Sequence, residues 1–152
     1  MLRYNGIIKE DTVNAEKGIH CTIFFQGCSH HCKGCYNPET WDFNSGLEFD
    51  ENKQKEFIKL CNMPYIDAIS LSGGDPLQQN EEEMYIFLKN LKEHTKKPIY
   101  CWSGYKYDDI KDNKLLEFID VLIDGEFHKD ELDNDCYLKG SINQQIIRIT
   151  NK

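Results

Sequence analysis

Stretches typical of β-strands and of α-helices alternate along most of this 152-residue chain. Strands that alternate with helices predict parallel βαβ units that share one sheet. A closed eight-fold β/α barrel takes roughly 250 residues. We therefore expect a single α/β domain over residues 1–152, an open partial β/α barrel with a mostly parallel sheet; a small doubly wound sheet is the alternative. The expected strands are 21–25, 66–71, 98–102, 121–123 and 145–149, and the expected helices are 50–61, 80–94 and 112–119.

The segment from Asn80 to His94 has the clearest helical pattern. From Met84 to Leu91, apolar residues recur at positions i, i+3, i+4 and i+7, which is the spacing of one helix face. Asn80 stands where an N-cap is expected, and Glu83 follows at the capping-box position. We expect this helix to bury its apolar face against the sheet.

The charge of the chain excludes some kinds of partner. It has 18 Lys and Arg residues against 26 Asp and Glu residues, a net charge of −8. That balance argues against nucleic acid and against anionic membrane surfaces, because both are bound through clustered cations. No apolar run approaches the roughly 18 residues of a membrane span, and the N-terminal residues lack the apolar core of a signal peptide. We expect a cytoplasmic protein.

The expected sheet also predicts where chemistry takes place. In sheets built from β/α units, functional residues lie beyond the C-terminal ends of the strands. Four loops occupy such positions: Gly27 to Tyr36, Ser72 to Pro76, Ser103 to Tyr105, and Asp124 to Phe127. We expect these loops to meet at one site.

The first of these loops carries three cysteines, Cys28, Cys32 and Cys35, within eight residues. Thiols this close together on one short loop indicate a metal site. Zinc would require a fourth ligand, which a nearby histidine could supply. An iron–sulfur cubane ordinarily takes four thiolates, so three would leave one iron open for a substrate. His30 and His31 are interpreted as loop residues, either exposed to solvent or tuning the metal site.

The other four cysteines stand alone. Cys21, Cys61 and Cys101 lie in apolar, periodic surroundings, so we expect them to be buried and inert. Cys136 lies in an acidic segment and is expected to be exposed.

The spacing Cys-x3-Cys-x2-Cys resembles the signature of the radical S-adenosylmethionine superfamily. The resemblance implies that Cys28, Cys32 and Cys35 hold a [4Fe–4S] cluster, whose open iron binds S-adenosylmethionine. One electron from the cluster would cleave the sulfonium to methionine and a 5′-deoxyadenosyl radical, which abstracts hydrogen atoms. Many members carry an aromatic residue before the third cysteine. Here Gly34 stands there, and the aromatic residue, Tyr36, follows it.

The second loop contains Gly73, Gly74 and Asp75. Glycines permit positive φ and a close approach of the backbone to a ligand. The run resembles the Gly-Gly-Glu motif of the superfamily, which binds the amino group of S-adenosylmethionine. Asp124, at the end of a later strand, is a further candidate for contact with the ligand or a cation; an ordinary Asp-Gly turn is the alternative.

Several stretches together resemble one family, the activating enzymes of anaerobic (class III) ribonucleoside-triphosphate reductase. They are Gly27 to Asn37 with Trp41, Leu71 to Leu77, Trp102 to Tyr105, Leu122 to Gly125, and Gly140 to Gln144. The resemblance implies a glycyl radical made on the large reductase subunit, with reduced flavodoxin or ferredoxin as electron donor. It also implies that Gly34, Cys35, Tyr36 and Gly74 bind S-adenosylmethionine.

Three alternatives remain at this point. The chain could activate another glycyl-radical enzyme, such as pyruvate formate-lyase. It could modify a small heterocyclic molecule. Or it could be a zinc-stabilised interaction module with no catalysis.

Overall fold

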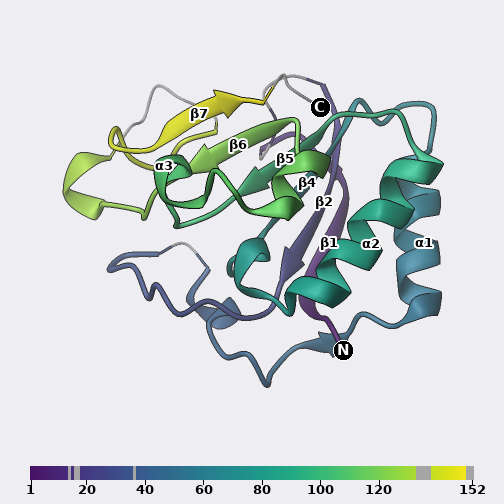
Figure 1. Ribbon diagram of the computed structural model, residues 1–152, viewed down its shortest axis with the longest axis horizontal. Coiled ribbons are helices and arrows are strands. Elements are labelled where there is room, and N and C mark those ends of the chain that lie inside the picture. The colour runs from purple at the N-terminus through teal and green to yellow at the C-terminus, as the bar shows by residue number, and fades with distance from the viewer. Residues whose placement is uncertain (14, 16–17, 36, 133–137, 150–152) are drawn as a thin grey trace.

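The computed structural model describes residues 1–13, 15, 18–35, 37–132 and 138–149. Seven strands form one sheet in the order β3-β1-β2-β4-β5-β6-β7, as the arrows in Figure 1 show. The four central strands, β2, β4, β5 and β6, run parallel to one another. The strands are β1 (Arg3–Asp11), β2 (His20–Phe25), β3 (Leu47–Glu48), β4 (Ala68–Gly73), β5 (Ile99–Trp102), β6 (Val121–Asp124) and β7 (Gln145–Arg148).

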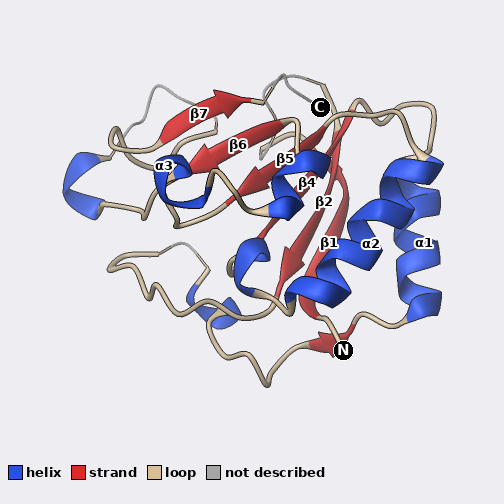
Figure 2. Ribbon diagram, viewed as in Figure 1, coloured by secondary structure: helices blue, strands red, loops and turns tan. Residues whose placement is uncertain are grey.

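Two long helices accompany the sheet, α1 (Glu51–Cys61) and α2 (Glu81–His94), and Figure 2 shows them side by side. A one-turn helix, α3 (Tyr107–Ile110), follows β5. Short 3₁₀ turns lie at Pro38–Thr40, Pro76–Gln78, Lys114–Phe118 and Lys129–Glu131. Among the described residues, no helix is long and apolar enough to cross a membrane.

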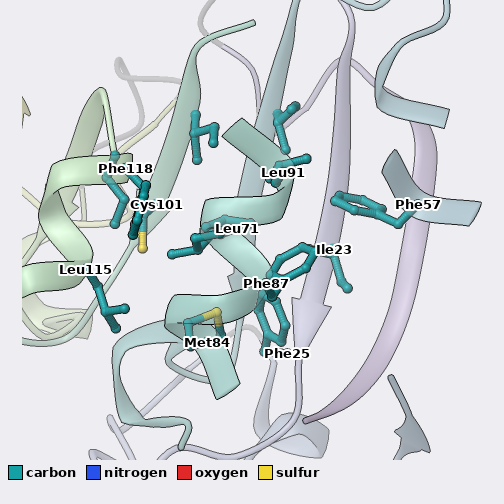
Figure 3. Packing of buried hydrophobic residues seen from close by; sticks show 14 of the residues in the cluster. Ile23, Phe25, Phe57, Leu71, Met84, Phe87, Leu91, Cys101, Leu115 and Phe118 are labelled. Atoms are coloured by element: carbon teal, nitrogen blue, oxygen red, sulfur yellow. The ribbon is translucent and has the colours of Figure 1, made fainter. Parts of the chain in front are cut away.

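The helices cover one face of the sheet and bury the main core against it. Side chains alternate along a strand, so Cys21, Ile23 and Phe25 of β2 join the main core. Figure 3 shows α2 and the strands contributing to this packing. Phe24, by contrast, lines a cleft on the other face of the sheet, as do Ser72 of β4 and Trp102 of β5. The pleat of the sheet thus separates the core from the cleft.

The α/β class and the open sheet are confirmed, but the expectation of a mostly parallel sheet is wrong at the edges. β1 and β7 each pair antiparallel with their neighbours, and so does β3. A parallel return needs a long crossover, usually a helix, whereas antiparallel strands can be joined directly. The link from β1 to β2 carries no helix among its described residues. The sequence analysis also missed β1 and β3, and part of its expected helix 112–119 is the 3₁₀ turn Lys114–Phe118.

The expected cap of α2 gives a direct test of the helix boundary. The Asn80 side-chain oxygen accepts a hydrogen bond from the backbone N–H of Glu83 at 3.0 Å. We expect Asn80→Ala to lower the free energy of unfolding by about 1 kcal/mol, measured by urea denaturation. Asn90→Ala, farther along the same helix, is the matched control. Equal losses in both variants would contradict a capping role for Asn80.

Candidate functional site

The four loops expected to carry chemistry meet at one cleft of about 610 Å³. Each parallel strand ends there, so residues distant in the sequence face the same space. Trp41, singled out together with the first loop, also lines the cleft, and sequence reasoning missed other walls, which include Val13, Thr40 and Leu138. The residues from the expected loops are Cys28, His30, Cys32, Cys35, Ser72, Gly73, Gly74, Asp75, Ser103, Gly104, Gly125 and Phe127.

All three cysteines of the first loop line this cleft, and each is partly exposed. Gly27 turns the chain out of β2 with φ +124°, and the Cys28 N–H then donates to the Trp41 carbonyl at 3.1 Å. The Cys35 N–H donates to the Cys32 carbonyl at 3.0 Å. Within the described part of the chain, no three His, Cys, Asp or Glu side chains are already gathered to hold a metal ion.

Two thiols of this loop, Cys28 and Cys32, lie in surroundings that raise their pKa. Burial raises the pKa of Cys28 to about 11. Burial likewise raises the pKa of Cys32. Because the thiolate is the form that ligates metal, a metal held by these two cysteines would displace their protons.

His30, interpreted from the sequence as a loop residue that is either exposed or tunes the metal site, contacts two carboxylates. Its Nε2 lies 2.8 Å from Asp75 Oδ2, and its Nδ1 lies 3.0 Å from Glu126 Oε2. The hydrogen bond to Asp75 raises the pKa of His30, and the charge of Asp75 and the contacts of Glu126 act in the same direction. His31 is different: its ring stacks on Trp41 with the centroids 4.5 Å apart.

The two glycines at the end of β4 join it closely to the end of β2. Gly73 has φ +105°, and a Cβ there would lie 2.4 Å from the backbone of Phe25. A Cβ on Gly74 would lie 2.4 Å from the carbonyl oxygen of Gly27. The Gly74 N–H donates to the Phe25 carbonyl at 2.9 Å. Only glycine fits either position, and both glycines line the cleft.

The carboxylate of Asp75 is occupied by protein donors. Asp75 is 1% exposed. Its Oδ1 accepts from the Leu77 N–H, and its Oδ2 accepts from the Ser103 hydroxyl and the Gly104 N–H. The Asp75 side chain is therefore buried among protein donors, and its contact with S-adenosylmethionine stays a prediction.

Asp124, at the end of β6, also accepts hydrogen bonds from the protein backbone. Its two oxygens accept from the N–H groups of Tyr107 and Gln145, at 2.7 and 2.9 Å. The residue is buried and is not among the described residues that line the cleft. These hydrogen bonds connect β7 and α3 to the end of β6. They agree with the alternative interpretation, in which Asp124 is a structural residue of an Asp-Gly turn.

The remaining expected residues differ in how they are placed. Gly34 adopts φ +77° and is exposed, with the Lys129 side chain against it. Tyr36 and Cys136 lie outside the described residues. The stretch from Gly140 to Gln144 reaches the cleft, where the Gln144 amide donates to the Gly125 carbonyl at 2.9 Å. Cys21, Cys61 and Cys101 are buried, as expected.

The chain is similar to a family described by an iron–sulfur cluster and to several named proteins. Residues 15–147 match the family described as a 4Fe-4S single cluster domain. The chain is 40% identical over 153 residues to the anaerobic ribonucleoside-triphosphate reductase-activating protein of Haemophilus influenzae, covering 97% of this chain and 98% of the relative. It is 39% identical to that of Pasteurella multocida, covering 98% and 99%. The protein of the same name from Enterobacteria phage T4 is 38% identical, covering 95% and 93%.

The chain belongs to the family of anaerobic ribonucleoside-triphosphate reductase-activating proteins.

The residues of this reductase-activating protein fit the cluster that its family implies. Thiolates are the usual ligands of iron–sulfur clusters, and three cysteines of one loop face a single cleft. The family match is to an iron–sulfur domain, which favours iron over the zinc alternative. His30 and Trp41 were the features that sequence reasoning undervalued. Their contacts with other segments of the chain appear only in the folded structure.

Proposed function

We propose that this chain reductively cleaves S-adenosylmethionine and thereby generates a glycyl radical on the large subunit of anaerobic ribonucleoside-triphosphate reductase. The observation that carries the proposal is the set of three cysteines, Cys28, Cys32 and Cys35, on one loop that faces an open cleft. The names of the full-length relatives support the target. When bound, the [4Fe–4S] cluster supplies the electron for cleavage and an open iron to hold the substrate.

The chain's own residues supply the binding surface in this proposal. Gly73 and Gly74 leave the backbone bare at the cleft, so its carbonyls can accept from the ammonium group of the substrate. This contact uses the backbone, because the Asp75 carboxylate is already occupied. Trp41 and Trp102 line other parts of the cleft and exclude water from it. Tyr36 remains the proposed aromatic contact after the third cysteine.

The open sheet favours a protein as the second substrate. Its edge strands, β3 and β7, do not pair with each other, so the sheet does not close around the cleft. A glycine on a loop of the reductase can then reach the site without threading a barrel. We propose that this sheet is the partial barrel of the radical S-adenosylmethionine type. Reduced flavodoxin or ferredoxin is the proposed electron donor, and the cytoplasm the proposed location.

Electron paramagnetic resonance on the reductase tests the function. The cluster-loaded protein is mixed anaerobically with its candidate large subunit, a reductant and S-adenosylmethionine. We expect a glycine-centred doublet that is absent when S-adenosylmethionine is omitted. Turnover of a small molecule with the reductase left unmodified would refute the proposal in favour of the small-molecule alternative. A doublet on a pyruvate formate-lyase type enzyme alone would refute it in favour of that target.

A further inference from the structure

The loop between the first two cysteines is held in place by His30. Its imidazole is largely buried, with 11% of the side chain exposed. One ring nitrogen contacts Asp75, just after β4, at 2.8 Å, and the other contacts Glu126, just after β6, at 3.0 Å. A single side chain thus connects the cysteine loop to the ends of two separate parallel strands.

The residues around the His30 imidazole leave a space that fits the ring. The Tyr105 ring meets it edge to face, with the centroids 5.0 Å apart. A Cβ at Gly104 would lie 2.4 Å from Cδ2 of the imidazole, so only glycine leaves room for the ring there. The contact with His30 therefore involves the ends of β4, β5 and β6 together.

Asp75 is the centre of this arrangement. A carboxylate has about four lone-pair sites, and four donors surround this one: His30 Nε2, the Ser103 hydroxyl, and the N–H groups of Leu77 and Gly104. Oδ2 accepts three of these bonds and Oδ1 accepts one, and the residue is only 1% exposed, so the Asp75 side chain orients the protein itself rather than a ligand. A buried carboxylate held by three other donors is a rigid anchor for the imidazole.

We infer that His30, anchored by Asp75, is a positioning residue that fixes the segment between Cys28 and Cys32 to the strand ends, so that both cysteines face the cleft where the cluster is proposed to bind. The inference rests on the proposed function, because it assumes that these cysteines bind the cluster. Ligands held in advance lose less conformational freedom on binding. The cluster has only three protein ligands, so a loosened first ligand exposes it to competing chelators.

A second contact also holds this loop, so the role of His30 can be tested by substitution without unfolding the protein. The Gln78 side chain accepts from the Ser29 N–H at 2.7 Å and donates to the Ser29 hydroxyl at 2.8 Å. The Gln78 amide nitrogen also lies 3.4 Å from His30 Nε2, but its two hydrogen bonds to Ser29 do not require the imidazole. A variant at His30 therefore loosens one anchor and keeps the other.

The test uses four variants and two measurements. The variants are His30→Ala, His30→Gln, Asp75→Asn and the double His30→Ala/Asp75→Asn. In the cluster-loaded protein, the rate of iron loss to a chelator is measured. In the metal-free protein, hydrogen–deuterium exchange is measured across residues 28–35. His31→Asn is the matched control, because it alters the same loop and asparagine tolerates the positive φ of 48° found there.

We expect His30→Ala to speed iron loss about tenfold, the scale of one lost charge-assisted hydrogen bond. His30→Gln, whose amide can still donate to Asp75, recovers part of that loss. The double variant loses iron no faster than the worse single variant, because the two residues act as one pair. His31→Asn stays within about twofold of the wild type, and exchange in the metal-free loop rises in the same order as iron loss.

Several results would overturn the inference. The inference fails if His30→Ala loses iron no faster than His31→Asn. It also fails if the rate increases of the two single variants multiply in the double variant. If Asp75→Asn weakened S-adenosylmethionine binding without affecting iron loss, Asp75 would act on the ligand instead. Failure of the proposed function is a separate outcome: the wild type would then yield no glycyl radical, while exchange in the metal-free loop still reports on His30. If Asp75→Asn does not fold, the rates of iron loss and of exchange in His30→Ala and His30→Gln are sufficient to test the inference.

Discussion

Cys32→Ala is expected to abolish cluster binding and reduce the glycyl-radical signal to background. The substitution leaves two thiol ligands on the loop, Cys28 and Cys35, where three are proposed. Iron–sulfur clusters depend on their thiolates for assembly, and two are too few to retain one against chelation. Iron and sulfide per chain, with absorption at roughly 400 nm, measure the cluster. Paramagnetic resonance of the reductase measures the radical.

Cys101→Ala is the matched control for this experiment. Cys101 is also a free cysteine, but it is 0% exposed and packs in the main core. Burial raises its pKa well above the ordinary thiol value, so it is poorly suited to ligate metal. We expect this variant to bind a full cluster. A full cluster in Cys32→Ala would show that the ligands are wrongly assigned, and a colourless wild type with tightly bound zinc would favour the interaction module.

Phe87→Ala is expected to cost about 3–5 kcal/mol of unfolding free energy. Phe87 of α2 is 0% exposed. Its ring centroid lies 5.0 Å from that of Phe49 and 6.2 Å from those of Phe25 and Phe57, and Figure 3 shows its ring beside Phe25. Truncation removes the apolar contacts and leaves a cavity. Domains are commonly stable by only about 5–15 kcal/mol, so much of the stability of the fold depends on this residue.

Urea denaturation followed by circular dichroism measures the loss, and Ile86→Ala serves as the control. Ile86 is the preceding residue of the same helix, but it is 61% exposed, so we expect a change within about 0.5 kcal/mol. A loss below about 1 kcal/mol in Phe87→Ala would mean that the aromatic residues do not hold α2 to the sheet. The comparison separates the packing of the side chain from the helix propensity of the segment.

Local patterns predicted most of the elements that place the site. The spacing of Met84, Phe87, Leu88 and Leu91 predicted α2, and these four residues are buried as expected. The positions after the strands predicted which loops form the cleft, and residues of all four line it. Both predictions rest on short-range rules: side-chain periodicity within an element, and the common direction of parallel strands.

The edges of the sheet could not be predicted in this way. β1, the segment Arg3–Asp11, is mostly polar and partly exposed, so its sequence lacks the apolar run that marked the central strands. It is a strand because it pairs with β2 over several residues. That pairing depends on a neighbour in space, and the sequence of β1 alone carries little of it.

By itself, the sequence determined the chemistry that this protein can carry: three closely spaced thiols on a loop that follows a strand, and a glycine turn one β/α unit later. These are local features, set by residue type and spacing. Only the tertiary structure decided the role of His30, whose partners Asp75 and Glu126 lie 45 and 96 residues away along the chain. It also decided that Asp75 faces protein donors. Hydrogen bonds between distant residues form only when the sheet brings the strand ends together, and no local pattern encodes them.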